Sequence, residues 1–437
     1  MEESKRDAEL RTPEAAVPIL PPQMPELPPE AQPFTADLRE KLLAFFIYIP
    51  AYLYLCTAWG SSAKFLTFCA LFIAMVEWRF WEQPRSLESW VWLGCLIVTA
   101  LSAPLGRDRV WGELRILFLH GFAIYWVLCR SGRLVGGMSG HLLPLDILNG
   151  VIVFPFKHFF LRIRTVVYTL THLRGGERKR PLLVMLSVLL ALLAAVLLLV
   201  FAVRELSGAD AAFDAAANRL LAALTPQIDE LTLWRFLTSL PVGAYLFGLI
   251  AGTGREPVER LHARGGETEC ALEVLRKVPN TVWSIVLGVF SAVYLAFFAL
   301  QASYLFGAFT QTVPEGYTIA EYARQGFFSL CRVMAVNFAL LWLVTRTCAQ
   351  PYRRTVTAVL STVLLAESML LAAVAASKLL LYIGSYGFTP LRLQSCWLIA
   401  VLFAGCICAL RTLWSGKASF RAWMLFSGVT LALLHLY

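Results

Sequence analysis

A long, almost wholly apolar run from Leu182 to Val203 constrains the fold more than any other feature of this sequence. The run contains no charged residue, and it is long enough to cross the hydrocarbon core of a bilayer as one helix, which takes about 20 apolar residues. Because lipid offers the backbone no hydrogen bonds, only helices and closed barrels cross a bilayer. We therefore predict an integral membrane protein built of helices.

The same apolar character extends along most of the chain. Of its 437 residues, 58% are apolar and only 15% are charged, whereas soluble domains carry roughly 25% charged residues. Apolar runs bounded by charge recur at 42–59, 64–78, 90–105, 113–129, 181–203, 236–252, 281–306, 327–345, 356–376, 396–413 and 422–437. At roughly 20 residues per crossing, this pattern predicts an all-α, polytopic membrane helix bundle of about 11 transmembrane helices. Little of the chain then remains for a soluble catalytic domain.

The 38 lysine and arginine residues indicate the orientation of these helices. Cytoplasmic loops of membrane proteins carry an excess of Lys and Arg. If the N-terminus is cytoplasmic, the segments on the inner side hold well over half of these residues, including a cluster from Arg130 to Arg180. We therefore predict a cytoplasmic N-terminus and a C-terminus outside. The net charge of +9 is then a topology signal, and nucleic acid is not an expected partner.

The first 41 residues differ from the rest in composition. They combine many acidic residues with prolines between Pro13 and Pro33, and such a segment buries too little apolar surface to fold. We predict a disordered, acidic, Pro-rich cytoplasmic tail at 1–41 and a transmembrane helical domain at 42–437. The tail is interpreted as a solvating segment; a docking peptide for a proline-binding groove is the alternative.

Two segments between the predicted spans are amphipathic. At 156–173, apolar residues recur at helical spacing with basic residues on the other side, which predicts a basic helix on the inner membrane surface. This helix would contact anionic lipid headgroups; the alternative is anchoring without lipid selectivity. The candidate contacts are Lys157, Arg162, Arg174, Arg178, Lys179 and Arg180. The outer amphipathic segment at 210–231 is interpreted as a lid over an outward-facing cavity or as a cover for the bundle.

Motifs of soluble enzymes are nearly absent from the sequence. It contains no Walker phosphate-binding loop, no HExxH zinc motif and no GxSxG elbow, and its ten cysteines form no CxxC pair. We therefore predict no catalytic residue, no metal site and no cofactor, in a protein that is not an enzyme. His141 and Asp146 have the HxxxxD spacing with which some acyltransferases place a base beside a carboxylate. This pair supports the least favoured hypothesis, a membrane-embedded lipid-modifying enzyme.

The most informative charged and aromatic cluster lies at the outer end of the eighth predicted span. Glu321, Arg324 and Arg332 share one helix face, and their charges suit a phosphate headgroup or an anionic solute. The candidate ligand-binding residues are Glu321, Tyr322, Arg324, Arg332 and Arg392, the last from the loop after the ninth span. The alternative is structural, because Thr318 and Glu321 have the spacing of a capping box and Tyr322 suits an aromatic belt at the membrane surface.

An acidic residue interrupts the ninth predicted span. Glu367 lies near its centre, where an ionised carboxylate costs at least about 2.5 kcal/mol unless it is paired. Lys378 is almost on the same helix face but about 16 Å away along the axis, too far for contact. Asn337 is a candidate partner, and internal water is another. We interpret Glu367 and Asn337 as candidates for intramembrane coupling to a proton or cation; the alternative is a neutral, hydrogen-bonded acid between helices.

Several short stretches resemble a known family. They are the run EYARQGFF at 321–328, the run YGFTPLRL at 386–393, the pair Asp210 and Phe213, and Pro155-Phe156 before the basic helix. Over roughly residues 40 to 437, the chain resembles the bacterial polytopic membrane proteins of the domain-of-unknown-function 4153 and 4173 type. The resemblance implies a multi-pass protein of the bacterial plasma (inner) membrane, and it transfers no catalytic residue.

The sequence favours two classes of function. The first is transport or binding of a lipid or small anionic solute, with the outer cluster as the ligand site and Glu367 as the coupling acid. The second is a non-catalytic membrane subunit in envelope sensing or assembly, whose partner would be another membrane protein. The expected partners are therefore membrane lipids, anionic headgroups at the inner leaflet among them, or a protein subunit.

Overall fold

The described part of the chain is helical. The computed structural model describes residues 34–57, 62–103, 112–172, 230–310, 315–324, 327–349 and 355–436, with seven further residues between 195 and 206. Within these ranges the only β-type pairing is one isolated bridge between Val278 and Cys348. The prediction of an all-α fold is confirmed for these residues. One compact unit spans Leu38–Tyr437, and it begins with the first helix.

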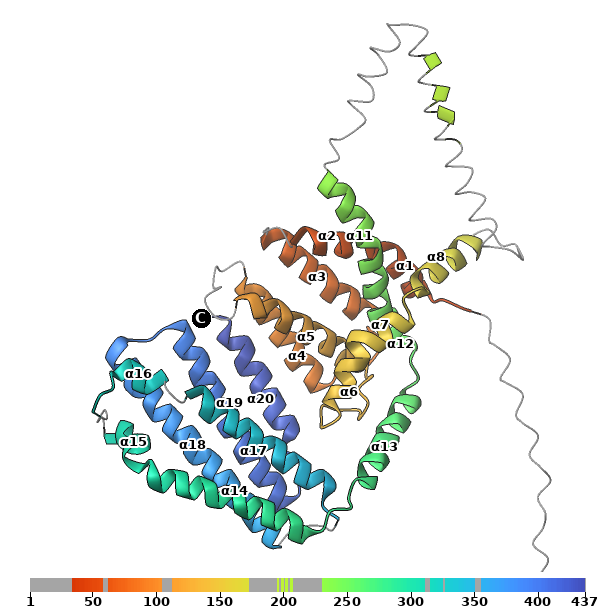
Figure 1. Cartoon of the computed structure of the whole chain (residues 1–437). Coiled ribbons are helices and arrows are strands. Elements are labelled where there is room, and N and C mark those ends of the chain that lie inside the picture. Colours follow the sequence, from red (N-terminus) through yellow and green to blue (C-terminus); the bar gives the residue numbers. More distant parts are fainter. Residues whose placement is uncertain are drawn as a thin grey trace, which may run out of the picture. The chain divides into compact units, whose positions relative to one another are not determined.

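A buried arginine joins two of the first five helices. The five helices are α1 (Leu38–Phe46), α2 (Tyr48–Thr57), α3 (Ser62–Arg79), α4 (Leu87–Ser102) and α5 (Gly112–Arg130) (Figure 1). α2 packs against α3, and α4 packs against α5. Arg130 is fully buried and donates hydrogen bonds to the Glu77 carboxylate at 2.9 Å and to the Phe80 carbonyl at 2.5 Å. These bonds fix the end of α5 to α3 and to the residue that follows it.

Two π-helical turns distinguish the middle of the chain. Its elements are α6 (Leu143–Leu148), the π-turn η2 (Asn149–Val153), α7 (Phe154–Lys157), α8 (Leu161–His172), α11 (Glu230–Phe247), the π-turn η3 (Gly248–Gly252), α12 (Thr253–Arg255) and α13 (Val258–Val274). α7 packs against both π-turns. The contact is close because Gly248 and Gly252 lack side chains: a Cβ atom there would lie 2.5 Å from the Pro155 carbonyl oxygen and 2.6 Å from the His158 Cβ.

The segment 156–173 is not the single helix that the sequence predicts. α7 ends at Lys157 and α8 begins at Leu161, and the helices on either side of this break are bent by 42°. The polar side of α8 faces the protein, where Thr165 is fully buried, whereas Phe160, just before α8, is 73% exposed and Ile163 is 53% exposed. His158, which lies at this break, contacts an acidic partner described below.

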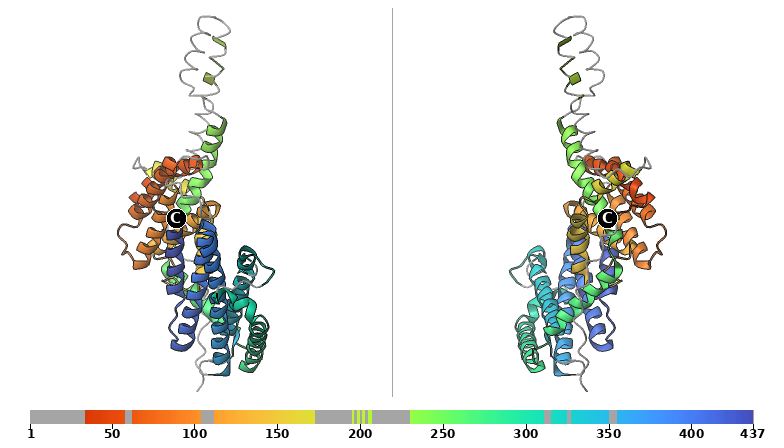
Figure 2. Two further views of the ribbon diagram at one scale, coloured as in Figure 1. Left: turned by 90° about the vertical axis from the view of Figure 1, so that its left-hand side faces the viewer. Right: turned by 90° about the vertical axis from the view of Figure 1, so that its right-hand side faces the viewer.

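The second half of the chain is a bundle centred on one long helix. Its elements are α14 (Asn280–Leu300), α15 (Ala302–Phe306), the 3-10 turn η4 (Gly307–Thr310), α16 (Ile319–Arg324), α17 (Phe327–Thr347), α18 (Val356–Tyr386), α19 (Pro390–Ser415) and α20 (Phe420–Leu434). α18 packs against α14, α17 and α19, and α19 packs against α20, and Figure 2 shows these helices running alongside one another. Leu287, Leu364 and Val374 are fully buried in the resulting core.

Six helical stretches among the described residues are long and apolar enough to cross a membrane. They are Leu38–Thr57, Leu231–Arg255, Asn280–Leu300, Ile319–Thr347, Val356–Tyr386 and Pro390–Ser415. The bent pair Leu143–Lys157 and Leu161–His172 would make a seventh if it forms one span, and Leu87–Ser102 and Phe420–Leu434 are shorter apolar helices. Helices also cover the predicted runs 64–78 and 113–129. Most of the predicted span 181–203 and nearly all of the outer segment 210–231 lie outside the described residues.

Candidate functional site

Glu367 lies buried in the middle of α18. Its residue is 5% exposed, although the surrounding helix is among the most apolar segments of the chain. The hydroxyl of Ser291 on α14 lies beside it, yet neither carboxyl oxygen of Glu367 has a hydrogen-bond partner within the part of the chain that the structure describes. A buried carboxyl group without a partner is rare, because native structures pair almost all of their buried polar groups.

A chain of hydrogen bonds runs next to Glu367 and joins three helices. The Tyr294 hydroxyl of α14 donates to Asn337 Oδ1 of α17 at 2.7 Å, and Asn337 Nδ2 donates to Ser368 Oγ of α18 at 2.8 Å. Ser368 in turn donates to the Leu364 carbonyl one turn earlier. Asn337 is therefore fixed by Tyr294 and Ser368, and it does not supply the hydrogen bond that Glu367 lacks. Asn337 bonds to Ser368, and Ser368 follows Glu367 directly in the chain. Asn337 and Glu367 therefore still belong to one polar layer.

The outer cluster is built differently from the ligand site that its spacing suggests. Glu321 and Thr318 form the predicted capping box: Thr318 N donates to Glu321 Oε2 at 3.1 Å, and Glu321 N donates to Thr318 Oγ1 at 3.3 Å. The Glu321 carboxylate also accepts from the Thr318 hydroxyl at 2.7 Å. The capping box is confirmed, and the carboxylate is engaged at the start of α16.

The three arginines of this cluster each contact their own segment. Arg324 donates to the Ala320 carbonyl at 3.3 Å, and Arg332 donates to the Ser329 hydroxyl at 3.2 Å. Arg392 donates to the Gly387 carbonyl and lies over the Tyr382 ring, 3.9 Å from its centroid. Arg324 and Arg332 are exposed. Local contacts of this kind anchor the side chains at the helix ends, and they leave the ligand-binding role of the arginines a prediction.

Tyr322 is the one member of the outer cluster that points into the protein. It is completely buried, donates from its hydroxyl to the Tyr304 carbonyl at 2.6 Å and accepts from Ala308 N at 3.2 Å. The ammonium group of Lys378 lies 4.3 Å from the centroid of the Tyr322 ring and 3.9 Å from that of Tyr304. Sequence reasoning missed this arrangement; the signal present was a lysine near the end of an apolar helix.

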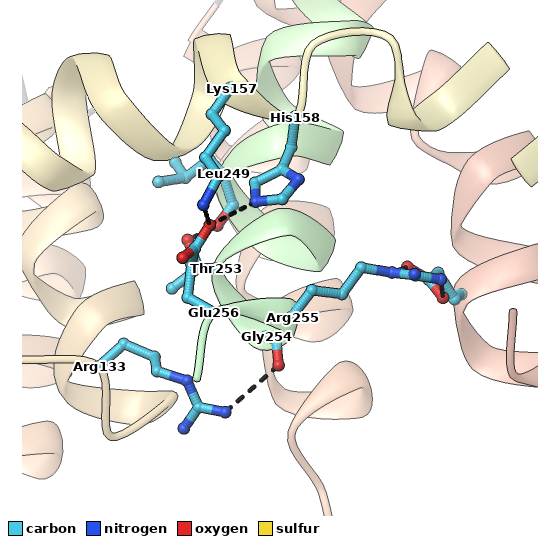
Figure 3. A network of polar contacts seen from close by, with 9 residues as sticks. Arg133, Lys157, His158, Leu249, Thr253, Gly254, Arg255 and Glu256 are labelled. Carbon is cyan, nitrogen blue, oxygen red and sulfur yellow. Dashed lines mark hydrogen bonds and ion pairs between the residues drawn. The ribbon is translucent and has the colours of Figure 1, made fainter. Parts of the chain in front are cut away.

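Residues of the predicted lipid-contacting helix bind other parts of the chain (Figure 3). Lys157 Nζ lies 2.5 Å from Glu256 Oε1, and His158 Nε2 lies 2.7 Å from the same oxygen. Burial opposes ionisation of Glu256, but these two hydrogen bonds outweigh it and hold the pKa of the carboxyl below its usual range. Arg133 donates to the neighbouring Gly254 carbonyl at 3.3 Å.

Arg162 is also engaged within the protein. Its Nε donates to the Ala44 carbonyl at 3.0 Å, and its guanidinium group lies over the Tyr48 ring. Lys157 and Arg162 therefore tie α7 and α8 to α1, α2 and the end of α12. Contact of these two residues with anionic lipid headgroups stays a prediction. The other candidate lipid contacts lie outside the described residues; they are Arg174, Arg178, Lys179 and Arg180.

His141 and Asp146 do not pair with each other. His141 Nε2 lies 3.1 Å from Glu269 Oε1, while Asp146 Oδ1 accepts from Val135 N at 2.7 Å. A cavity of about 200 Å³ beside His141 is lined by His141, Glu269, Leu272, Glu273, Arg276 and Arg346. Among the described residues, no three His, Cys, Asp or Glu side chains are grouped so that they could hold a metal ion.

Comparison with known proteins places the chain in a family. A search of curated proteins and a search of solved structures each found no match. A family model described as "Domain of unknown function (DUF4153)" matches residues 54–437. The match includes every helix from α3 to α20 and the polar layer around Glu367. The resemblance noted from the EYARQGFF and YGFTPLRL runs is thereby confirmed, and the chain belongs to the DUF4153 family.

Proposed function

We propose that this chain is a membrane transport protein that moves a lipid or small anionic solute, with protonation of Glu367 as the coupling step. The observation that carries this proposal is the buried Glu367 carboxyl, neither oxygen of which has a hydrogen-bond partner among the residues that the structure describes. An acidic residue inside a membrane helix is costly, and such residues commonly serve proton or ion pathways.

The surroundings of Glu367 support reversible proton exchange. An ionised carboxylate at this depth costs about 2.5 kcal/mol or more, so the apolar helix accommodates the neutral acid best. The hydroxyl of Ser291 beside Glu367 can rotate and offer either a donor or an acceptor. Loss of the proton to water leaves a carboxylate that must gain a partner, and this requirement links the protonation state to a change in helix packing.

The proposal includes a topology and a location. About 11 spans, with the N-terminus in the cytoplasm and the C-terminus outside, follow from the distribution of Lys and Arg. The six long apolar helices, the two shorter ones, the helices over 64–78 and 113–129 and the run 181–203 together support this number. A bacterial plasma membrane location and contact with anionic lipid at the inner leaflet belong to the same proposal.

We also propose that the chain is not an enzyme. The side chains that would form a catalytic base and its orienting carboxylate, His141 and Asp146, contact Glu269 and Val135 instead. A non-catalytic subunit of a sensing or assembly complex is the alternative, and it predicts that Glu367 is dispensable.

A charge-displacement experiment tests the coupling step. The full chain is reconstituted in vesicles on a solid-supported membrane, and a pH step is applied with and without each of a panel of small anions. Proton uptake by Glu367 should produce a transient current that Glu367→Gln abolishes. The matched control is Glu267→Gln, which removes an exposed carboxylate on α13 and should leave the current intact. An unchanged current in Glu367→Gln contradicts the proposal and favours the subunit.

A further inference from the structure

Lys378 is a second charged residue buried on α18. Its residue is 2% exposed, and eleven residues separate it from Glu367, so the two lie almost on one helix face about 16 Å apart along the axis. The Tyr304 and Tyr322 rings lie 3.9 and 4.3 Å from its ammonium group, measured to their centroids. Both buried charges of α18 thus face the same side of the helix.

The aromatic rings leave the ammonium group incompletely satisfied. An ammonium group has three N–H donors, and within the described ranges Lys378 makes neither an ion pair nor a hydrogen bond; its contacts are the two rings. Cation–π contacts offset part of the cost of removing an ammonium ion from water, but they accept none of its N–H hydrogen bonds. The N–H donors therefore have capacity for an acceptor of opposite charge.

The walls of this site are held in place by hydrogen bonds of their own. The Tyr322 hydroxyl bridges the Tyr304 carbonyl and Ala308 N, and the two rings meet edge to face with centroids 5.2 Å apart. α15, η4 and α16 are thereby locked around Lys378 before any ligand binds. The Tyr304 ring also packs on Tyr317, which is 40% exposed, so the aromatic group continues from Lys378 to the protein surface.

We infer that Lys378, walled by Tyr304 and Tyr322, is the anchor of a binding site for an oxyanion, a carboxylate or phosphate group on a free solute or a lipid headgroup. A role of this site in transport rests on the proposed function, and the substrate class would then be oxyanions. It also gives the two charges of α18 complementary tasks, because an anion carried with a proton crosses the membrane with less net charge than the anion alone.

A binding experiment tests the site without any gradient. The full chain in phosphatidylcholine nanodiscs is titrated with sodium phosphate, and separately with sodium acetate, at an ionic strength held constant with sodium chloride. The measurement is the shift of the thermal unfolding midpoint. Nanodiscs that contain phosphatidylglycerol, without added phosphate, form the second arm, and a shift confined to that arm assigns the site to a headgroup.

The variants isolate the charge of Lys378. Lys378→Met should lose the saturable shift in every arm, and Lys378→Arg should retain part of it. Lys417→Met removes an exposed lysine beyond α19 and should behave as the wild type. The absence of a saturable shift in the wild-type protein, or an equal shift in Lys378→Met, overturns the inference.

A labelling measurement covers the case in which Lys378→Met does not fold. Reductive methylation of the wild-type chain, followed by mass spectrometry, should modify Lys378 at least several-fold more slowly when saturating phosphate or phosphatidylglycerol is present, with Lys417 as the internal reference. Equal rates with and without the anion overturn the inference. Because this binding needs no transport, it can hold while Glu367→Gln leaves the pH-step current unchanged, and the two proposals fail separately.

Discussion

The hydrogen bond between Tyr294 and Asn337 gives the most direct test of the buried polar layer. Tyr294→Phe removes one hydrogen bond, and Asn337→Leu, a change of similar volume, removes two. Side-chain hydrogen bonds between membrane helices contribute about 0.6 kcal/mol on average and about 1.7 kcal/mol at most. The expected loss in the free energy of unfolding is therefore about 0.6 kcal/mol for Tyr294→Phe and about 1.2 kcal/mol for Asn337→Leu.

The double variant isolates the bond itself. Because Asn337→Leu already removes the acceptor of the Tyr294 hydroxyl, the double variant should cost about the same as Asn337→Leu alone, which gives a coupling energy of about 0.6 kcal/mol. The assay is reversible unfolding of the four proteins in mixed micelles. Tyr382→Phe serves as the control, since the ring of Tyr382 on α18 contacts Arg392 while no hydrogen bond of its hydroxyl is recorded among the described residues. A coupling energy indistinguishable from zero refutes the hydrogen-bonded layer described here.

Three further predictions concern the π-turn region. Gly252→Ala should lower the free energy of unfolding by about 1–3 kcal/mol, because the new methyl group meets the His158 side chain. Gly266 lies on α13 with open space around it, so Gly266→Ala should raise the free energy of unfolding by about 0.5–1 kcal/mol in the same assay. The pKa of Glu256 in the folded protein lies below its ordinary value near 4.5. The stabilisation that Glu256 provides is therefore complete above about pH 4.5, and it is lost as the pH falls through the lowered pKa. Glu256→Gln should remove this part of the acid sensitivity in an unfolding titration from pH 6 to 3, and an unchanged acid profile would contradict the assignment. Glu40→Ala should lower the free energy of unfolding by about 3–5 kcal/mol, because Glu40 is 2% exposed and makes two hydrogen bonds to a guanidinium group. Arg39→Ala should lower it by less than about 1 kcal/mol, because the carboxylate that pairs with Arg39 is 80% exposed. Equal losses in the two variants would refute the comparison.

Local patterns in the sequence predicted the features that depend on neighbouring residues. The spacing of Thr318 and Glu321 predicts a capping box, because both partners lie within one helical turn. The apolar runs predict helices in the same way, and helices cover every predicted span that lies in the described ranges. The buried acid of α18 was also predicted, since a charged residue inside an apolar run is visible without any knowledge of packing.

Contacts between distant segments could not be predicted. Asn337 was considered as a partner for Glu367, yet its partners are Tyr294 and Ser368, a choice set by how α14, α17 and α18 rotate against one another. The partner of His158 at the bend is likewise Glu256, which is 98 positions away along the chain. Spacing alone records which residues share a face of a helix, and it does not record what that face meets.

The two π-turns also set the phase of the helices that contain them. A π-turn closes its hydrogen bonds one residue later than an α-helix, so it behaves like a single residue inserted into an otherwise regular helix. Each residue turns an α-helix by about 100°, and η3 lies directly before α12 and Glu256. Loss of the extra residue would rotate Glu256 by that angle, away from Lys157 and His158. An insertion or deletion of one residue at η3 would therefore rotate the helical residues that follow it about the helix axis. In a helix shortened there, these residues could not keep the same partners.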